Sequence, residues 1–174
     1  MAHESEDLGR VAFATWAYLL HAGGVRAADD EVASACDDVS SASEAATGDV
    51  AGLRLLRRVD ALFDGPSEPE RMLAVARKLF GNRARADLGE GDREARAAGF
   101  RKYQFAQGLP WLARIWERND GKVAPTWLLI EKVDGTVHAM DPNPWNDVDE
   151  ERKLPVADFQ VLWELDGCSN VLLR

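Results

Sequence analysis

The feature that most constrains the fold is a change in the spacing of apolar residues near residue 108. Before this point, apolar residues recur at the three- and four-residue intervals of helices with a buried face. After it, apolar blocks alternate with Asn119-Asp120-Gly121 and Asp134-Gly135, which are typical of hairpin turns. Helices followed by an antiparallel meander define an α+β architecture. We therefore predict a single α+β domain over residues 1–174, with a helical half at about 7–100 and a strand-rich half at about 108–174.

Local signals set the ends of the predicted helices. Gly23-Gly24 ends the first helix, and Ser67-Glu68-Pro69-Glu70 is typical of a capping box with an early proline. Small and polar residues predict loops at 40–48 and 82–99, the second with one exposed helical turn. The predicted helices are 7–21, 29–36, 49–63, 67–80 and 156–163. The predicted strands are 109–116, 126–133, 136–140 and 171–173.

Charge and hydropathy exclude several classes of partner. The chain has 21 Lys and Arg against 30 Asp and Glu, a net charge of −9, whereas nucleic acids and anionic membranes require a cationic footprint. Residues 67–122 carry a net charge of +4, which is either a contact for an acidic partner or, as we favour, a solvated face. No apolar run approaches the roughly 20 residues of a membrane span, and a signal-peptide pattern is lacking. We expect a cytoplasmic protein that binds no nucleic acid and does not insert into membranes.

The histidines and cysteines offer no metal or cofactor site. His3, His21 and His138 are far apart, none is near a cysteine in sequence, and no CxxC or HExxH motif is present. Neither a P-loop nor a GxGxxG motif occurs, so we expect no nucleotide cofactor. Cys36 and Cys168 are too few for a disulfide framework, and we interpret both as buried free thiols in a reducing compartment.

Short motifs follow a distinctive order in the strand-rich half. Thr126-Trp127-Leu128-Leu129-Ile130 opens a strand, a turn follows at Asp134-Gly135, and the next strand ends in Met140-Asp141-Pro142. This order resembles the bacteriocin-processing (double-glycine leader) cysteine peptidases, in which His-Trp or His-Tyr opens the first of these strands. Upstream, Asp7-Leu8-Gly9 before a buried helix resembles the Asp-Cys-Gly motif that carries their nucleophile. The resemblance touches nearly the whole chain and implies a papain-like fold.

Carried onto this chain, the resemblance implies an inactive peptidase. Leu8 stands at the position of the nucleophile, and its side chain has no group that attacks a carbonyl. Thr126 stands at the position of the general base, and its hydroxyl does not take a thiol proton near neutral pH. Asp141, which would orient the histidine, is the one triad residue of the family's type. Residues 3–6 contain no glutamine for an oxyanion hole. The nucleophile, the general base and the oxyanion-hole residue of a cysteine–histidine mechanism are therefore all missing.

The residues around the lost triad form a candidate binding site. Trp127 follows the vacant base position, and Asn143 and Trp145 lie in the loop after Asp141. A tryptophan beside a cleft is a frequent anchor for a peptide, although packing over its own loop is the other role open to Trp145. The function we predict is a non-catalytic, peptidase-like domain that binds a peptide or protein partner in the former cleft.

Two alternatives to this function stay open. The first is an enzyme that keeps the fold and uses a different chemistry, in which a carboxylate acts as base after burial raises its pKa. Its candidate residues are Asp141, Thr126 and Glu131. The second is a structural interaction protein whose helical half docks a partner through an apolar groove. Its candidate residues are Leu53, Leu56 and Arg57.

Overall fold

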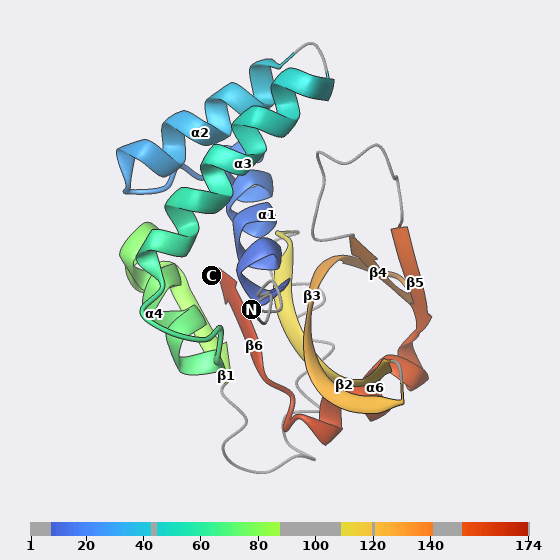
Figure 1. Ribbon diagram of the computed structural model, residues 1–174. Helices are drawn as coiled ribbons and strands as arrows, with labels where there is room; N and C mark the ends of the chain where they lie inside the picture. Colours follow the sequence, from blue (N-terminus) through green and yellow to red (C-terminus); the bar gives the residue numbers. More distant parts are fainter. Residues whose placement is uncertain (1–7, 43–44, 88–108, 120, 141–150, 174) are drawn as a thin grey trace.

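The computed structural model confirms the α+β class and describes residues 8–42, 45–87, 109–119, 121–140 and 151–173 (Figure 1). These residues form five α-helices, one short 3-10 helix and six strands. The helices are α1 (Leu8–Ala22), α2 (Asp30–Ser41), α3 (Ala45–Leu62), α4 (Pro69–Phe80) and α6 (Val156–Leu165), with the 3-10 helix at Gly81–Arg83. The strands are β1 (Ala84–Asp87), β2 (Trp111–Asn119), β3 (Lys122–Val133), β4 (Thr136–Met140), β5 (Glu151–Pro155) and β6 (Asn170–Leu173).

The six strands form one antiparallel sheet in the order β1-β6-β2-β3-β4-β5. Its centre is the long β2–β3 hairpin, whose pairing runs from Trp111 opposite Ile130 to Asn119 opposite Lys122. The final strand, β6, lies between β1 and β2, so the last residues of the described chain are in the sheet interior. All strands of the predicted meander are present, and the ladder between β3 and β4 is interrupted by a bulge after Ile130.

The central strands are buried on both faces, which explains their continuous apolar runs. On β2, Leu112 points into a core shared with α1–α4, while Trp111 and Ile115 point into a second core shared with α6. Successive residues of β3 and β6 alternate between the same two cores. The sheet therefore separates four helices on one face from α6 on the other (Figure 1).

Helix α1 is the central element of the larger core. It packs against β2 and β3 on one side and against α2 and α3 on the other, which confirms the prediction of a mostly buried helix. Phe13 and Trp16 are fully buried and meet edge to face with ring centroids 5.4 Å apart. The indole Nε1 of Trp16 donates a hydrogen bond of 2.9 Å to the Pro110 carbonyl, which ties α1 to the start of β2.

Several sequence predictions of element boundaries were wrong, and two strands were missed. The second helix continues to Ser41 and the third begins at Ala45, so most of the predicted 40–48 loop is helical. Within the predicted 82–99 loop, residues 84–87 form β1, which pairs with β6. Strand β5 was not predicted at all, and β3 begins at Lys122 rather than residue 126. The two missed strands lack a strong apolar period, and pairing with a neighbouring strand determines their structure.

The signals predicted for the helix ends agree with the structure only in part. Pro69 occupies the first turn of α4, as predicted, but the N-cap is Glu68 and its side chain makes no capping hydrogen bond, so the capping box is wrong. Gly23 and Gly24 follow the end of α1, and Gly24 adopts a φ of 93°.

Across the described ranges, no helix has the combined length and apolar character needed to cross a bilayer.

Candidate functional site

The first turn of α1 lies against β3, next to the two positions that the resemblance assigns to the lost catalytic pair. Gly9 directly follows Leu8, and Trp127 directly follows Thr126. A Cβ built on Gly9 would lie 2.7 Å from Cδ1 of Trp127 and 2.1 Å from Oγ of Ser67. Only a residue without a side chain permits this approach, so the fold brings the chain at Leu8 and at Thr126 together from opposite halves of the sequence.

The side chains at these two positions differ in exposure. Leu8 is 54% exposed although it is a large apolar residue, and Thr126 is half-buried on β3, opposite Ile115 of β2. Neither carries a nucleophilic or basic group active at neutral pH. The other predicted members of the site, Asp141, Asn143 and Trp145, lie outside the described residues. The surface at the start of α1 therefore offers apolar contacts through Leu8. Because Trp127 points into the core shared with α1, the side chain of Thr126 points to the other face of the sheet, as that of Ile115 does.

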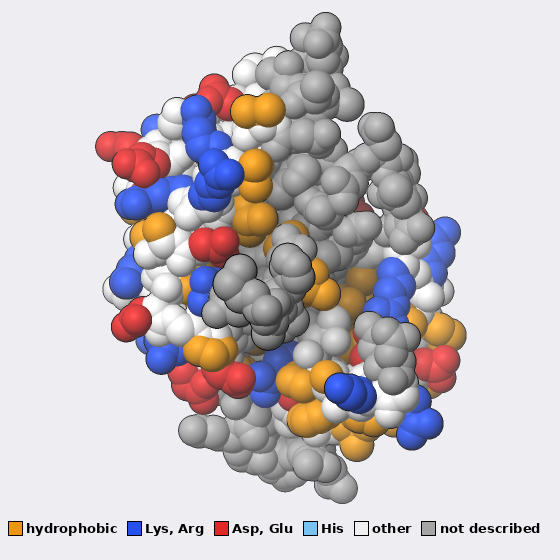
Figure 2. All heavy atoms as spheres, viewed as in Figure 1, with side chains coloured by type: hydrophobic (Ala, Val, Ile, Leu, Met, Phe, Trp, Pro, Cys, Tyr) orange, Lys and Arg blue, Asp and Glu red, His pale blue; other side chains and the backbone are white. Residues whose placement is uncertain are grey.

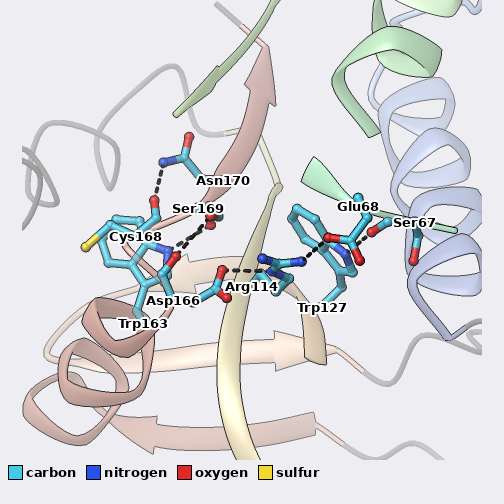
Figure 3. Close-up of polar contacts among 9 residues, drawn as sticks. All are labelled: Ser67, Glu68, Arg114, Trp127, Trp163, Asp166, Cys168, Ser169 and Asn170. Atoms are coloured by element: carbon cyan, nitrogen blue, oxygen red, sulfur yellow. Dashed lines mark hydrogen bonds and ion pairs between the residues drawn. The ribbon is translucent and has the colours of Figure 1, made fainter. Parts of the chain in front are cut away.

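Trp127 forms a fixed wall beside this surface. Its ring is only 7% exposed, and its Nε1 donates a hydrogen bond of 2.8 Å to the Ser67 carbonyl. The guanidinium of Arg114 lies over the ring, with Cζ 5.9 Å from the ring centroid, a cation–π geometry. Figure 3 shows the indole between Arg114 and the Ser67–Glu68 segment. The indole is thus held on two sides, and little of its surface is accessible to a ligand.

Arg114 connects three parts of the fold, and sequence reasoning did not identify it. Its Nε donates to Asp166 Oδ2 at 2.8 Å, and its Nη1 donates to Glu68 Oε2 at 2.9 Å. Burial of the guanidinium works against its charged form, but the hydrogen bonds and charges of Asp166 and Glu68 outweigh burial and raise the pKa of Arg114. Because its partners are 52 and 46 residues away, no local pattern could have revealed this cluster.

The turn after α6 positions Asp166 for this contact. Gly167 donates its backbone N–H to Glu164 and Cys168 donates to Trp163, each at 2.9 Å, which is the hydrogen-bond pattern of a Schellman cap. Gly167 has a φ of 69° and Cys168 a φ of 60°, so both adopt the left-handed conformation. The Asp166 carboxylate is therefore directed back toward Arg114, and its side chain is 2% exposed.

The same turn buries Cys168 as predicted. Its side chain lies in the core that contains Trp163, and Trp163 Nε1 donates a hydrogen bond of 2.9 Å to the Ser169 carbonyl. Asn170 Nδ2 donates to the Cys168 carbonyl at 3.0 Å (Figure 3). These contacts close the turn and define the start of β6.

The remaining candidate groups do not supply a nucleophile or a metal site within the described residues. Cys36 is buried in α2 as predicted, and burial together with the charge of Asp37 raises the pKa of its thiol to about 12. A thiol with this pKa is protonated at neutral pH and is a poor nucleophile. Among the residues that the structure covers, no group of three or more His, Cys, Asp and Glu side chains is arranged to hold a metal ion.

Comparisons with known proteins add no family to these observations. No protein-family model matches the chain, and neither the comparison with curated proteins nor that with solved structures found a match.

Proposed function

We propose that this chain is a non-catalytic domain of papain-like type that binds a peptide or an unfolded protein segment beside the start of α1. The observation that carries the proposal is the contact of Gly9 with Trp127 and Ser67. In the proposed arrangement, this contact sets the start of α1 beside the backbone of β3 at Thr126, the two places where the resemblance puts a peptidase nucleophile and base. The expected place of action is the cytoplasm, where Cys36 and Cys168 stay reduced.

The chemistry of this surface supports binding over turnover. An exposed leucine gains free energy when an apolar side chain of a ligand covers it, about 25 cal/mol for each Å² of apolar surface removed from water. Trp127 keeps the surface rigid, which reduces the entropy lost on binding.

A binding assay with a permanently unfolded protein tests this proposal. The probe is fluorescein-labelled, reduced and carboxymethylated lactalbumin, and the measurement is fluorescence anisotropy. We expect the wild-type chain to bind and Leu8→Asp to weaken binding at least about tenfold, because a carboxylate at this position loses the apolar contact. Val161→Asp is the matched control, since Val161 is 59% exposed on α6, on the other face of the sheet.

A second assay separates binding from catalysis. We expect no hydrolysis of an internally quenched peptide substrate by the wild-type chain. Turnover that Thr126→Ala abolishes would replace the proposal with an enzyme. Equal loss of binding in Leu8→Asp and Val161→Asp, with unchanged circular dichroism, would show that the start of α1 is not the binding surface.

A further inference from the structure

A second surface, on the solvent side of α3, combines exposed apolar residues with arginines. Its members recur at three- and four-residue intervals and therefore share one side of the helix. Val50 is 71% exposed and Leu53 is 46% exposed, although large apolar side chains are usually covered. We refer to Val50, Leu53, Arg54, Arg57 and Ala61 as the α3 face. Figure 2 shows Lys and Arg side chains over α3 with apolar side chains beside them.

The charge of this face differs from that of its surroundings. Residues 1–66 hold only five Lys or Arg against 12 Asp or Glu, and three of those five are Arg54, Arg57 and Arg58. Arg58 is used within the fold: its Nη2 lies 2.6 Å from Asp29 Oδ2 and its Nε lies 3.2 Å from Glu31 Oε2. The hydrogen bonds that Arg58 donates to Asp29 raise the pKa of Arg58. The α3 face itself thus holds two arginines and no acidic residue, on a part of the chain that is acidic as a whole.

Of the two arginines of the α3 face, Arg57 is the one that a partner can use. Arg54 forms an ion pair with Asp38, whereas Arg57 has no acidic partner among the described residues and is exposed. Arg57 also lines an open groove of about 560 Å³ between α2 and α3, together with Ser34 and Ala61. A guanidinium at the edge of such a groove binds a carboxylate in bidentate geometry.

We propose that the α3 face docks an acidic amphipathic helix of a protein partner. Apolar side chains of that helix would cover Val50 and Leu53, and its carboxylates would pair with Arg57 and Arg54. A nucleic acid fits this face less well, because Asp30 and Glu31 also line the groove and repel a continuous polyanion. Separate carboxylates on a helix can meet the arginines and avoid these acids, which is the complementarity that fixes register at interfaces.

The test uses two synthetic helical peptides of about 18 residues that carry Leu and Glu, or Leu and Lys, on one side. Binding of each labelled peptide to the full chain is measured by anisotropy. We expect the Glu peptide to bind and the Lys peptide not to bind. Arg57→Glu and Leu53→Asp should each weaken binding of the Glu peptide at least about tenfold, and Arg57→Glu should gain affinity for the Lys peptide. Binding should also weaken as salt is raised.

A matched variant controls for net charge. Arg77→Glu makes the same charge change on an exposed residue of α4 and should leave binding of the Glu peptide unchanged. Failure of the Glu peptide to bind, equal binding of both peptides, or equal effects of Arg57→Glu and Arg77→Glu would overturn the proposal. A wild-type dimer in sedimentation equilibrium that Leu53→Asp dissociates would also overturn it, since a second copy would then occupy the face.

Discussion

At the scale of single residues, Gly9 sets how closely α1 approaches the sheet. We expect Gly9→Ala to destabilise the fold by about 2 kcal/mol, because the added methyl group overlaps Ser67 and Trp127. Urea unfolding followed by circular dichroism measures this change. Gly23→Ala is the control: its Cβ would lie 3.4 Å from the nearest atom, the Leu19 carbonyl oxygen, and we expect a change within roughly 0.5 kcal/mol. Equal effects of the two substitutions would mean that Gly9 does not determine the approach.

Arg114 has a larger expected effect, because its removal leaves the buried Asp166 carboxylate without a counterion. We expect Arg114→Met to cost about 3 kcal/mol, measured by urea unfolding. Glu68→Gln removes only the exposed partner of the same arginine and should cost less than about 1 kcal/mol. The double variant Arg114→Met with Asp166→Asn should recover part of the loss. No recovery would mean that Arg114 acts through its packing on Trp127 and not through its charge.

At the scale of elements, the sequence predicted those that carry a strong apolar period and missed those that depend on a partner strand. Helices α1 and α4 and the hairpin of β2 and β3 have apolar side chains at regular spacing, so their type was predictable. Strand β5, Glu-Arg-Lys-Leu-Pro, is a charged edge strand, as is common where edges avoid aggregation. Its strand conformation depends on pairing with β4. Residues 141–150 separate the two strands, so the sequence of β5 alone contains no signal of this pairing.

The same limit applies to the candidate site. The sequence predicted that the chain around Leu8 and around Thr126 belongs to one site; in the structure Gly9 lies against Trp127, and the site itself stays a prediction. It did not predict Arg114, because an arginine between apolar strand residues is typical of a solvent-facing position. Only the turn after α6 shows that this arginine meets a buried carboxylate. Long-range polar contacts of this kind leave no periodic pattern in the sequence.

A histidine joins β5 to the rest of the sheet and makes this element sensitive to pH. His138 on β4 hydrogen-bonds to Glu151 of β5 and, at 3.0 Å, to Asp134 of the preceding turn. The hydrogen bonds to Glu151 and then Asp134 raise the pKa of His138 above its ordinary value near 6.5. Lys132 and Lys153 lie across from His138 in the two ladders, and each is within 4 Å of one of the two carboxylates.

The sign of the pH effect follows from this shift. Protonated His138 binds the two carboxylates only in the folded state, so its contribution to stability is complete below about pH 6.5 and is lost as pH rises through the raised pKa. We expect His138→Gln to reduce the free energy of unfolding more at pH 6 than at pH 9. Urea unfolding at both pH values measures this difference, and NMR titration of the histidine measures the pKa. An equal effect at both pH values would show that the ion pairs do not stabilise β5.

At the scale of the whole molecule, one sheet couples two cores. Strands β2, β3 and β6 send alternate side chains into both, so the two cores share the same strands. The change of apolar spacing near residue 108 predicted the two halves. It did not predict that β1, from the helical half, would pair with β6 at the end of the chain. This pairing argues that the halves unfold as one cooperative unit.

The two cysteines allow this cooperativity to be measured, because each lies in a different core. Cys36 is buried with α1–α4, and Cys168 is buried with α6. With the pKa of Cys36 raised to about 12 by burial and by Asp37, its thiol should react with an aromatic disulfide reagent only after unfolding. In the single-cysteine variants Cys36→Ala and Cys168→Ala, we expect the labelling rate of the remaining thiol to rise with urea along the same slope and midpoint. Faster labelling of Cys168 at low urea would instead show that the α6 core opens separately, and the predicted single domain would then consist of two units.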